Sequence, residues 1–258
     1  MLKNKKKSYL KISVVTVCLN SEKTIKRCLE SVIKQNYPNN KIEHIVIDGA
    51  SNDSTVSIIK KKIKHIKFFQ SKKDQGIYDA MNIGIKKCTG DVIVMLNSDD
   101  YFFDNTFSIV SRYFNNHKID YLFGSVIKER VYHNFFPDAI WYTFNIYPSH
   151  SVSFFIKKKT QKITGRYNIG FKYSADRDFL YRLIKNKKFN GMAVKKREVF
   201  GKFCLQGASS RVGFLEKNIE EIRIRISNNE NIFKIVLFFL IYLNYYFIKK
   251  IIRFFKYV

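Results

Sequence analysis

Two adjacent carboxylates, Asp99 and Asp100, stand two residues beyond the end of the apolar run Val92–Leu96. A short run rich in Val and Ile predicts a strand that is buried on both faces. Two carboxylates held close together repel each other unless a proton or a cation lies between them. A divalent cation with oxygen ligands is the ordinary solution, and it typically bridges the phosphates of a substrate. From this motif alone, an aspartate-rich turn between a strand and a helix is an equally good explanation.

The elements around this motif alternate between strands and helices. Apolar runs predict strands over 12–20, 42–49, 66–71, 91–97 and 119–126. Helical spacing and capping residues predict helices after Ser21 and over 55–63, 77–87 and 104–115. This alternation predicts an α/β fold with a parallel sheet. The later part is less regular: 127–172 is aromatic-rich, and we expect a helix over 176–185, a strand or hairpin over 191–205 and a helix over 212–227.

Three polar residues stand at the ends of predicted strands: Asn20, Asp48 and Asp99. Right-handed crossovers bring the C-terminal ends of parallel strands to one edge of the sheet. Ligands of open α/β sheets bind at that edge, so we expect these side chains at one ligand-binding rim. Asp53 follows the second strand, and a role as N-cap of the helix that begins near Thr55 explains it completely.

The charge of the chain leaves several partners open. A formal charge of +26 over 258 residues is compatible with nucleic acid, an anionic membrane surface or an acidic substrate. A basic nucleic-acid-binding protein should show Arg-rich patches or a recognisable binding module, but the chain shows dispersed Lys and no such module. A metal-dependent nucleotidyltransferase, which would release pyrophosphate, is a second alternative.

Cysteine usage and the N-terminus indicate a reducing compartment. The four cysteines form no C-x-x-C pair and no metal-like spacing, so buried reduced thiols are expected, as in the cytoplasm. The basic N-terminus lacks the apolar segment of a secretory signal. No G-x-G-x-x-G or G-x-x-x-x-G-K-[ST] motif is present, so the usual dinucleotide and P-loop sites lack their sequence motifs.

Two longer stretches, "SVVTVCLNSEKTIKRCLESVIKQNYPNNKIEHIVIDGASNDST" and "KKDQGIYDAMNIGIKKCTGDVIVMLNSDD", carry a family resemblance. In this order they resemble the family 2 glycosyltransferases, most of all the bacterial enzymes that build capsular, O-antigen and exopolysaccharide chains. The match covers about Lys11 to Arg211. It implies the GT-A fold, an open, mostly parallel sheet with helices on both faces. It also implies a nucleotide-sugar donor, a divalent metal (Mn²⁺ or Mg²⁺) and inversion at the anomeric carbon.

The resemblance also implies roles for residues on the donor side. Asp48 resembles the aspartate that contacts the nucleotide base. Asn97-Ser98-Asp99 stands where the family has its D-x-D motif, so Asp99 matches the metal-binding carboxylate and Asp100 is an adjacent candidate ligand. Asn97 departs from the usual first Asp, although an amide can still hydrogen-bond ribose or base.

The segment "DQGIYDAMNIG" resembles the family's G-x-x-x-A-R-N-x-G stretch. Met81 stands where Arg is often found, and we expect Lys73 to supply the missing positive charge. Asp79 faces away from the apolar stripe of this helix and is the better candidate for contact with the donor. Asn20, at the same predicted rim, completes the expected donor-binding residues.

On the acceptor side, "YSADRDFLYRL" resembles the family's E-D-x-D-L-x-x-R-L stretch, with Ala175 in place of Glu. Asp176 then falls on the general base. An acceptor hydroxyl is a poor nucleophile, so a carboxylate must take its proton as it attacks the anomeric carbon. The structural alternative makes Asp176 a helix cap and Asp178 an exposed residue.

Two further segments resemble acceptor-site and donor-site features of the family. His150 lies in a Pro-x-His segment and is expected to line the acceptor site. "LQGASSR" resembles a Gly-Gly-x-Ser loop, in which Ser209 or Arg211 would contact the donor phosphates.

The C-terminal segment differs in kind. Ile235–Ile248 is an apolar run of 14 residues interrupted only by Asn244, and "KKIIRFFKYV" follows it. As a helix the run would measure about 21 Å, short of the hydrocarbon core of about 30 Å. A basic amphipathic helix with Phe on its apolar side predicts an interfacial anchor.

Together these features predict an inverting, metal-dependent glycosyltransferase attached to the inner face of the cell membrane, with a lipid-linked glycan as acceptor. The expected domains are a GT-A domain over 1–230, with a donor half over 10–126 and an acceptor half over 127–230. A membrane-associating helical tail would follow over 231–258.

Overall fold

The computed structural model describes residues 9–204 and 213–256 of the chain. The chain divides into two compact units, Met1–Gly207 and Ala208–Val258. The sequence instead placed the boundary at residue 230, so the helix before it falls with the C-terminal helix rather than with the acceptor half.

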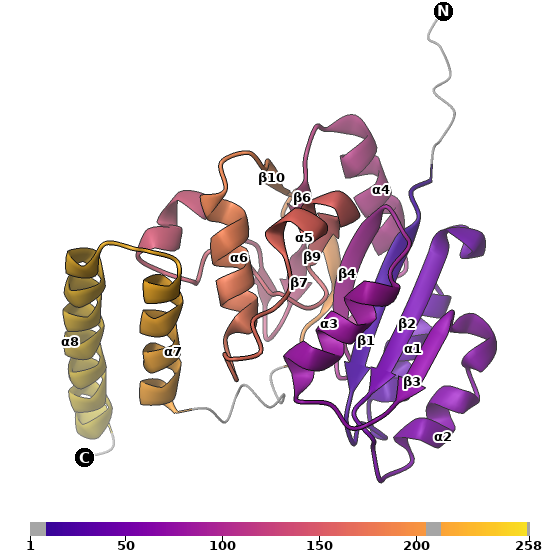
Figure 1. The fold of residues 1–258 in the computed structure, drawn as a ribbon, viewed down its shortest axis with the longest axis horizontal. Coiled ribbons are helices and arrows are strands. Elements are labelled where there is room, and N and C mark those ends of the chain that lie inside the picture. The colour runs from indigo at the N-terminus through magenta and orange to yellow at the C-terminus, as the bar shows by residue number, and fades with distance from the viewer. Residues whose placement is uncertain (1–8, 205–212, 257–258) are drawn as a thin grey trace, which may run out of the picture. The chain divides into compact units, whose positions relative to one another are not determined.

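The first unit is built on a seven-stranded sheet in the order β10-β6-β9-β4-β1-β2-β3 (Figure 1). Its strands are β1 (Ile12–Cys18), β2 (Ile42–Asp48), β3 (Phe68–Ser71), β4 (Val92–Asn97), β6 (Tyr121–Phe123), β9 (Phe154–Lys157) and β10 (Gly191–Ala193). Strand β9 runs antiparallel to both neighbours, and the other pairs are parallel. The sheet is therefore mostly parallel, as predicted.

Helices cover both faces of this sheet. They are α1 (Ile25–Ile33), α2 (Thr55–Lys60), α3 (Ile77–Lys87), α4 (Thr106–Asn116), α5 (Lys158–Thr164) and α6 (Ala175–Lys185), with short 3₁₀ turns η1 (Asn39–Lys41), η2 (Ile63–His65) and η3 (Pro137–Trp141). Val14 of β1 belongs to a core cluster with residues of α1 and α4. The next residue, Val15, faces α3, where a Cβ on Gly84 would lie 2.3 Å from its Cγ1. Successive residues of a strand point to opposite faces, so both faces of β1 are buried.

The ends of four strands lie at one edge of the sheet. In the parallel register Val17 pairs with Asn97, and Cys18 pairs with Asp48. Asp48 pairs in turn with Ser71, the last residue of β3. The sheet thus delivers the polar ends of β2 and β4 to the same rim, on either side of β1.

A second, four-stranded sheet follows the order β5-β11-β7-β8. Its strands are β5 (Tyr101–Phe102), β7 (Ser125–Ile127), β8 (Val131–Tyr132) and β11 (Val199–Lys202). The single strand predicted over 119–126 is wrong, because the chain leaves the large sheet at Gly124 and enters the small one. A Cβ at Gly124 would lie 2.0 Å from the ring of Phe200, so a larger residue would displace that ring. The hairpin considered over 191–205 is likewise wrong, since β10 and β11 belong to different sheets.

The region over 127–172 contains structure that the sequence did not predict. Strand β9 fills the position between β4 and β6, and α5 follows it directly. The first three residues of β9 are buried. A four-residue strand carries too short a pattern to separate it from other aromatic segments nearby.

The second unit is a pair of helices, α7 (Phe214–Ser227) and α8 (Ile232–Lys256). At the turn between them, the Glu230 N–H donates to the carbonyl of Arg225 at 3.0 Å. The Arg225 guanidinium lies 4.4 Å from the ring centroid of Phe238, so α8 packs on α7 through this face. Across the described residues, every helix is too short or too polar to cross a bilayer.

Candidate active site

Two buried oxygens at the end of β4 lack hydrogen-bond donors. Within the described residues, neither Asn97 Oδ1 nor Asp100 Oδ2 accepts a hydrogen bond. Their neighbouring groups are held in place: the Asn97 N–H donates to Ser151 Oγ at 2.9 Å, and the Cys204 N–H donates to Asp100 Oδ1 at 2.7 Å. Buried polar atoms are nearly always paired, so these two oxygens are candidates for contact with a ligand or ion.

The carboxylates at this position resist ionisation. Burial raises the pKa of Asp99, and burial followed by the negative charge of Asp99 raises the pKa of Asp100 to about 7. Arg27 is the nearby cation, but its guanidinium donates to the Asp99 backbone carbonyl at 3.0 Å and lies 4.5 Å from the ring centroid of Tyr101. Ionisation of both carboxyl groups would therefore leave negative charge that Arg27 offsets only in part.

Asp99 and Asp100 fit a divalent cation whose remaining ligands come from a substrate. The described residues contain no group of three or more His, Cys, Asp or Glu side chains that could hold a metal. Mg²⁺ is commonly bound through one or two carboxylates together with substrate phosphates. The unpartnered oxygen of Asp100 and the raised pKa values agree with such a site.

Asp48 and Asn20 join two loops at the same rim. Asp48 is fully buried, and its carboxylate accepts from the Ser51 N–H at 3.0 Å, from Ser51 Oγ at 2.5 Å and from Ser71 Oγ at 2.7 Å. Asn20 has a positive φ of 49°, and its Oδ1 accepts from the Asn52 N–H at 3.0 Å. The structure thus brings both predicted residues to the loop after β2, where the nucleotide contact of Asp48 stays a prediction.

Helix-capping roles in these loops differ from the prediction. Asp53 Oδ1 accepts from the Thr55 N–H at 2.9 Å, and its Oδ2 accepts from the Glu22 N–H at 3.1 Å. The residue before α2 is Ser54, so Asp53 fastens the loop to Glu22 as well as supporting the helix start. Ser21 does not cap α1 with its side chain, because its hydroxyl contacts Ser98 Oγ at 2.8 Å.

The residues around the start of α3 form a small acidic group. Asp79 Oδ2 accepts from the Gln75 N–H at 3.1 Å, which satisfies a donor just before the helix. Burial raises the pKa of Asp74, and the charges of Asp79 and Asp48 raise it further. Lys73 is exposed beside this group. Donor contacts of Lys73 and Asp79 stay predictions.

Asp176 lies near the start of α6, and its side chain is hydrogen-bonded to a residue of α3. The Tyr78 hydroxyl lies 2.9 Å from Asp176 Oδ1. Asp178 is buried, whereas the alternative with Asp176 as helix cap expected it to be exposed. Its carboxylate forms an ion pair with Arg182 at 3.0 Å. The residue before α6 is Ser174, so Asp176 is not the cap. Of the two aspartates, Asp176 is the one that the structure leaves without an ion pair among the described residues.

His150 lies close to this side of the molecule but is buried. Its Nε2 lies 2.8 Å from the Tyr167 hydroxyl, and its ring packs against Tyr167 and Phe154. Burial lowers the pKa of His150, and the charge of Asp176 partly opposes this. His150 and Asp176 are thus brought together, while direct contact of His150 with an acceptor stays a prediction.

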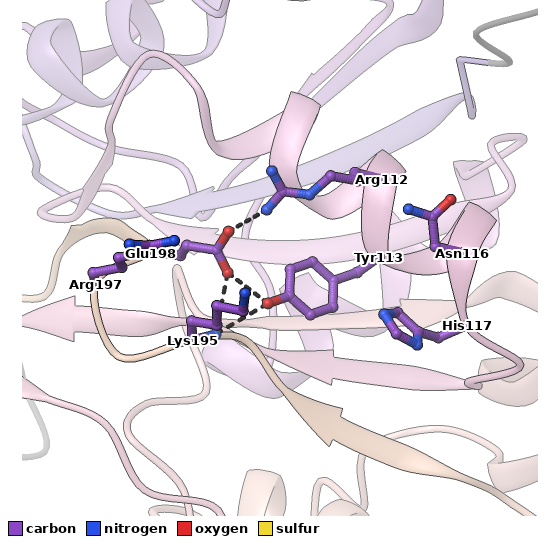
Figure 2. Close-up of a pocket in the computed structure, with 7 residues that line it drawn as sticks. All are labelled: Arg112, Tyr113, Asn116, His117, Lys195, Arg197 and Glu198. Atoms are coloured by element: carbon purple, nitrogen blue, oxygen red, sulfur yellow. Dashed lines mark hydrogen bonds and ion pairs between the residues drawn. The ribbon is translucent and has the colours of Figure 1, made fainter. Parts of the chain in front are cut away.

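The structure also contains a hollow of about 310 Å³ that includes none of these residues (Figure 2). It lies between the end of α4 and the turn before β11, and its lining includes Arg112, Tyr113, Lys195 and Glu198. Glu198 pairs with Arg112 and accepts from the Tyr113 hydroxyl at 2.5 Å. These contacts fasten the turn to α4, so we assign the hollow a structural role.

The sequence missed several residues that contact the predicted site. Ser151 accepts a hydrogen bond from the Asn97 N–H at the end of β4, and the Cys204 N–H donates to Asp100. The Tyr78 hydroxyl is hydrogen-bonded to Asp176. Tyr78 and Ser151 lie in segments that carry the family resemblance, "DQGIYDAMNIG" and the Pro-x-His segment with the residue after it, but neither residue was singled out. Ser209 and Arg211, the expected phosphate-binding residues, lie outside the described residues. All four cysteines are free, as predicted.

Comparison with known proteins identifies the class of this protein. The model of glycosyl transferase family 2 matches residues 13–183, and the chain belongs to this family. An uncharacterized glycosyltransferase of Mycobacterium tuberculosis is 31% identical over 179 residues, which cover 66% of this chain and 68% of that protein. The chain is therefore a glycosyltransferase, which favours sugar transfer over the two alternatives that the sequence left open.

Solved structures confirm the GT-A fold. Staphylococcus aureus TarS 1–349 in complex with UDP superposes with a TM-score of 0.68 at 20% identity, covering 84% of this chain and 64% of that one. A mannosyltransferase of Pyrobaculum calidifontis in complex with GDP-Man and Mn²⁺ gives a TM-score of 0.65 at 14% identity, covering 86% and 64%. The chain thus spans slightly less than two thirds of each crystallised protein.

We expect Asp100→Asn to stabilise the metal-free protein at pH 8. The folded-state pKa of this acid is raised, so the unfolded chain releases the proton first and stability falls as pH rises from about 4 to about 7. The amide removes the buried charge, and its oxygen can still accept the hydrogen bond from the Cys204 N–H. The substitution should therefore raise the free energy of unfolding by about 1–3 kcal/mol at pH 8 and by almost nothing at pH 4. Urea unfolding in EDTA at both pH values measures this.

Asp104→Asn, on an exposed side chain four residues further on, is the control and should change stability at neither pH. Lower stability of Asp100→Asn at pH 8 would show that the carboxylate is satisfied in the folded protein.

Proposed function

We propose that the chain transfers a sugar, with inversion, from a nucleotide-sugar donor to a lipid-linked glycan in cell-surface polysaccharide synthesis, such as capsule or O-antigen. The reaction would require a divalent cation, Mn²⁺ or Mg²⁺. The observation that carries the proposal is the end of β4, where Asn97 Oδ1 and Asp100 Oδ2 are buried without donors beside Asp99. A divalent cation would supply the positive charge that these oxygens lack, and the diphosphate of a nucleotide sugar would complete its ligands.

On the donor side, Asp99 and Asp100 would hold the cation. The cation would neutralise the departing diphosphate. Asp48 and Asn20 shape the neighbouring loop at the end of β2, where the nucleoside is expected. Two of the structural relatives contain UDP or GDP-Man, which supports a nucleotide sugar as donor.

On the acceptor side, Asp176 would take the proton from the attacking hydroxyl. Its carboxylate accepts one hydrogen bond among the described residues, at Oδ1, which leaves Oδ2 for the acceptor. Attack assisted by such a base, on the face opposite the diphosphate, inverts the anomeric carbon in one step. TarS carries the description poly(ribitol-phosphate) beta-N-acetylglucosaminyltransferase, which supports a polymeric acceptor.

We expect Asp99→Asn to reduce transfer by about 10²-fold or more, because loss of several kcal/mol of charge stabilisation has that effect on rate. The assay is release of nucleoside diphosphate from a panel of nucleotide sugars, with Mn²⁺ or with EDTA. Asp104→Asn is the exposed control from the same loop region. Wild-type turnover of Asp99→Asn with unchanged metal dependence would contradict the metal site.

Asp176→Asn should lower kcat by about 10²–10⁴-fold and leave the KM for the donor nearly unchanged, because the amide cannot accept the proton. Asp178→Asn is the matched control. Loss of its charge weakens the ion pair with Arg182, so it should lower the free energy of unfolding by about 1–3 kcal/mol with little change in kcat. Steady-state kinetics and thermal melts separate the two effects. Normal turnover of Asp176→Asn together with loss of turnover in Asp178→Asn would show that Asp178, and not Asp176, is the general base.

The C-terminal helix supports attachment to the membrane. Most of its exposed apolar residues recur at helical spacing on one side: Phe233, Val236, Leu237, Leu240, Ile241, Phe247 and Ile248. We call these the apolar face of α8. Ile232 and Phe239 are also exposed but do not fall on this stripe. Ile235 and Phe238, on the other side of the helix, are buried. No acidic residue follows Glu230, whereas Lys234, Lys249, Lys250, Arg253 and Lys256 are basic. An apolar face with basic residues suits the interface of an anionic membrane.

The apolar face of α8 lies within the tail that the sequence predicted over 231–258. The side chains over 249–258, where the basic amphipathic segment was expected, lie outside the described residues. Asn244 falls on the apolar face, but its Nδ2 donates to the Leu240 carbonyl at 2.8 Å. This bond lowers the penalty of burying the amide among apolar groups.

We expect the full-length protein to float with vesicles that contain anionic lipids, and the double variant Leu237→Glu/Ile241→Glu to stay in the dense fraction. Both changes place carboxylates on the apolar face of α8, where burial and the lipid charge oppose them. Ile163→Glu/Ile169→Glu, on exposed apolar residues of the first unit, is the control and should still float. Equal flotation of all three proteins would exclude the α8 anchor.

A further inference from the structure

Helix α3 carries two side chains that hold the segment leading into α6. The Tyr78 hydroxyl lies 3.0 Å from the carbonyl of Tyr173 and 2.9 Å from Asp176 Oδ1. One turn later, Asn82 Nδ2 donates to the carbonyl of Tyr167 at 2.9 Å, and the Tyr167 N–H donates to Asn82 Oδ1 at 3.0 Å. Residues four apart on a helix lie on the same face, so one face of α3 makes both contacts. We call this line of contacts between α3 and the segment Tyr167–Asp176 the seam.

This seam links the two sides of the proposed reaction. Helix α3 begins at Ile77, just beyond Asp74 and Gln75 at the rim where the donor is expected, and the Asp79 carboxylate accepts a hydrogen bond from the Gln75 N–H. The segment that it holds leads to Asp176, on the acceptor side. The position of the base is therefore set by a helix that starts at the donor rim.

We propose that Tyr78 is a positioning residue, whose hydroxyl holds the Asp176 carboxylate in the orientation from which it takes the acceptor proton. The inference rests on the proposed role of Asp176 as general base. It adds a residue of the donor half to the machinery of proton transfer.

Packing alone does not explain the Tyr78 hydroxyl. The ring is nearly buried and lies 5.9 Å from the ring centroid of Tyr167, a contact that Phe would make equally well. Burial raises the pKa of Tyr78 well above its usual value, and the charge of Asp176 raises it further. The hydroxyl therefore stays protonated at neutral pH and remains a hydrogen-bond donor there.

The hydroxyl has one proton and two acceptors, and the ionised carboxylate is the stronger of them. A bond to Oδ1 fixes rotation of the carboxylate and leaves Oδ2 to receive the proton. Loss of such a bond should act on the reaction step, because the donor contacts lie elsewhere. A hydrogen bond to a charged group corresponds to about 10–100-fold in rate.

Tyr78→Phe tests the proposal, with Tyr113→Phe as a matched control. Tyr113 is a second buried tyrosine whose hydroxyl bonds a carboxylate, that of Glu198, outside the site (Figure 2). We expect Tyr78→Phe to lower kcat by about 10–100-fold with the donor KM within about twofold, while Tyr113→Phe keeps wild-type kcat. In the double variant Asp176→Asn/Tyr78→Phe, kcat should equal that of Asp176→Asn alone, since Tyr78 acts through Asp176.

Melting curves for each variant define the temperature at which all are folded, and kinetics are compared there. The proposal is overturned by a kcat of Tyr78→Phe within twofold of the wild type. It is also overturned if the two losses multiply in the double variant, because Tyr78 would then act independently of Asp176. Wild-type kcat of Asp176→Asn alone is a different result, which would overturn the base assignment and this inference with it.

Discussion

Burial of both faces of the central sheet is the constraint on which the rest of the first unit depends. All seven residues of β1 are buried, with α1 and α4 packed on one face and α3 on the other. An isolated charge is expensive in such an interior unless it is paired and hydrogen-bonded. Charged residues that bind a ligand are therefore expected at the strand ends, which is where Asp48 and the Asn97–Asp100 motif lie.

Two buried carboxylates, Glu43 near the start of β2 and Asp100 just after β4, differ in how fully the protein satisfies them. Burial alone would raise the pKa of Glu43, but hydrogen bonds from Ser13 and Thr89 and the ammonium of Lys11 outweigh it and lower the pKa to about 2. Asp100 is also buried, and burial and the charge of Asp99 raise its pKa to about 7, although the Cys204 N–H and Ser151 partly oppose this. The protein thus favours the ionised form of the first carboxyl group, whereas a positive ligand would be needed to favour that of the second.

The parts of the molecule that sequence reasoning predicted are those with local causes. Helix α3 begins and ends at the predicted residues, and strands β1, β2 and β4 lie within the predicted ranges, because long apolar patterns determine them. Strand β9 was missed because its place between β4 and β6 depends on pairing with residues more than 30 positions away. The break at Gly124 was missed for the same reason, since the ring that requires a glycine belongs to Phe200.

The candidate site divides in the same way. The residues at the end of β4 adjoin one another in sequence, so a motif is enough to find them. The environment of Asp176 depends on Tyr78, 98 residues earlier, and on the His150–Tyr167 pair. No local pattern could assign the hydroxyl of Tyr78 to a carboxylate in another helix. In the proposed reaction, short motifs would therefore encode the donor-side chemistry, while proton transfer to Asp176 would depend on the tertiary packing of α3 against the segment before α6.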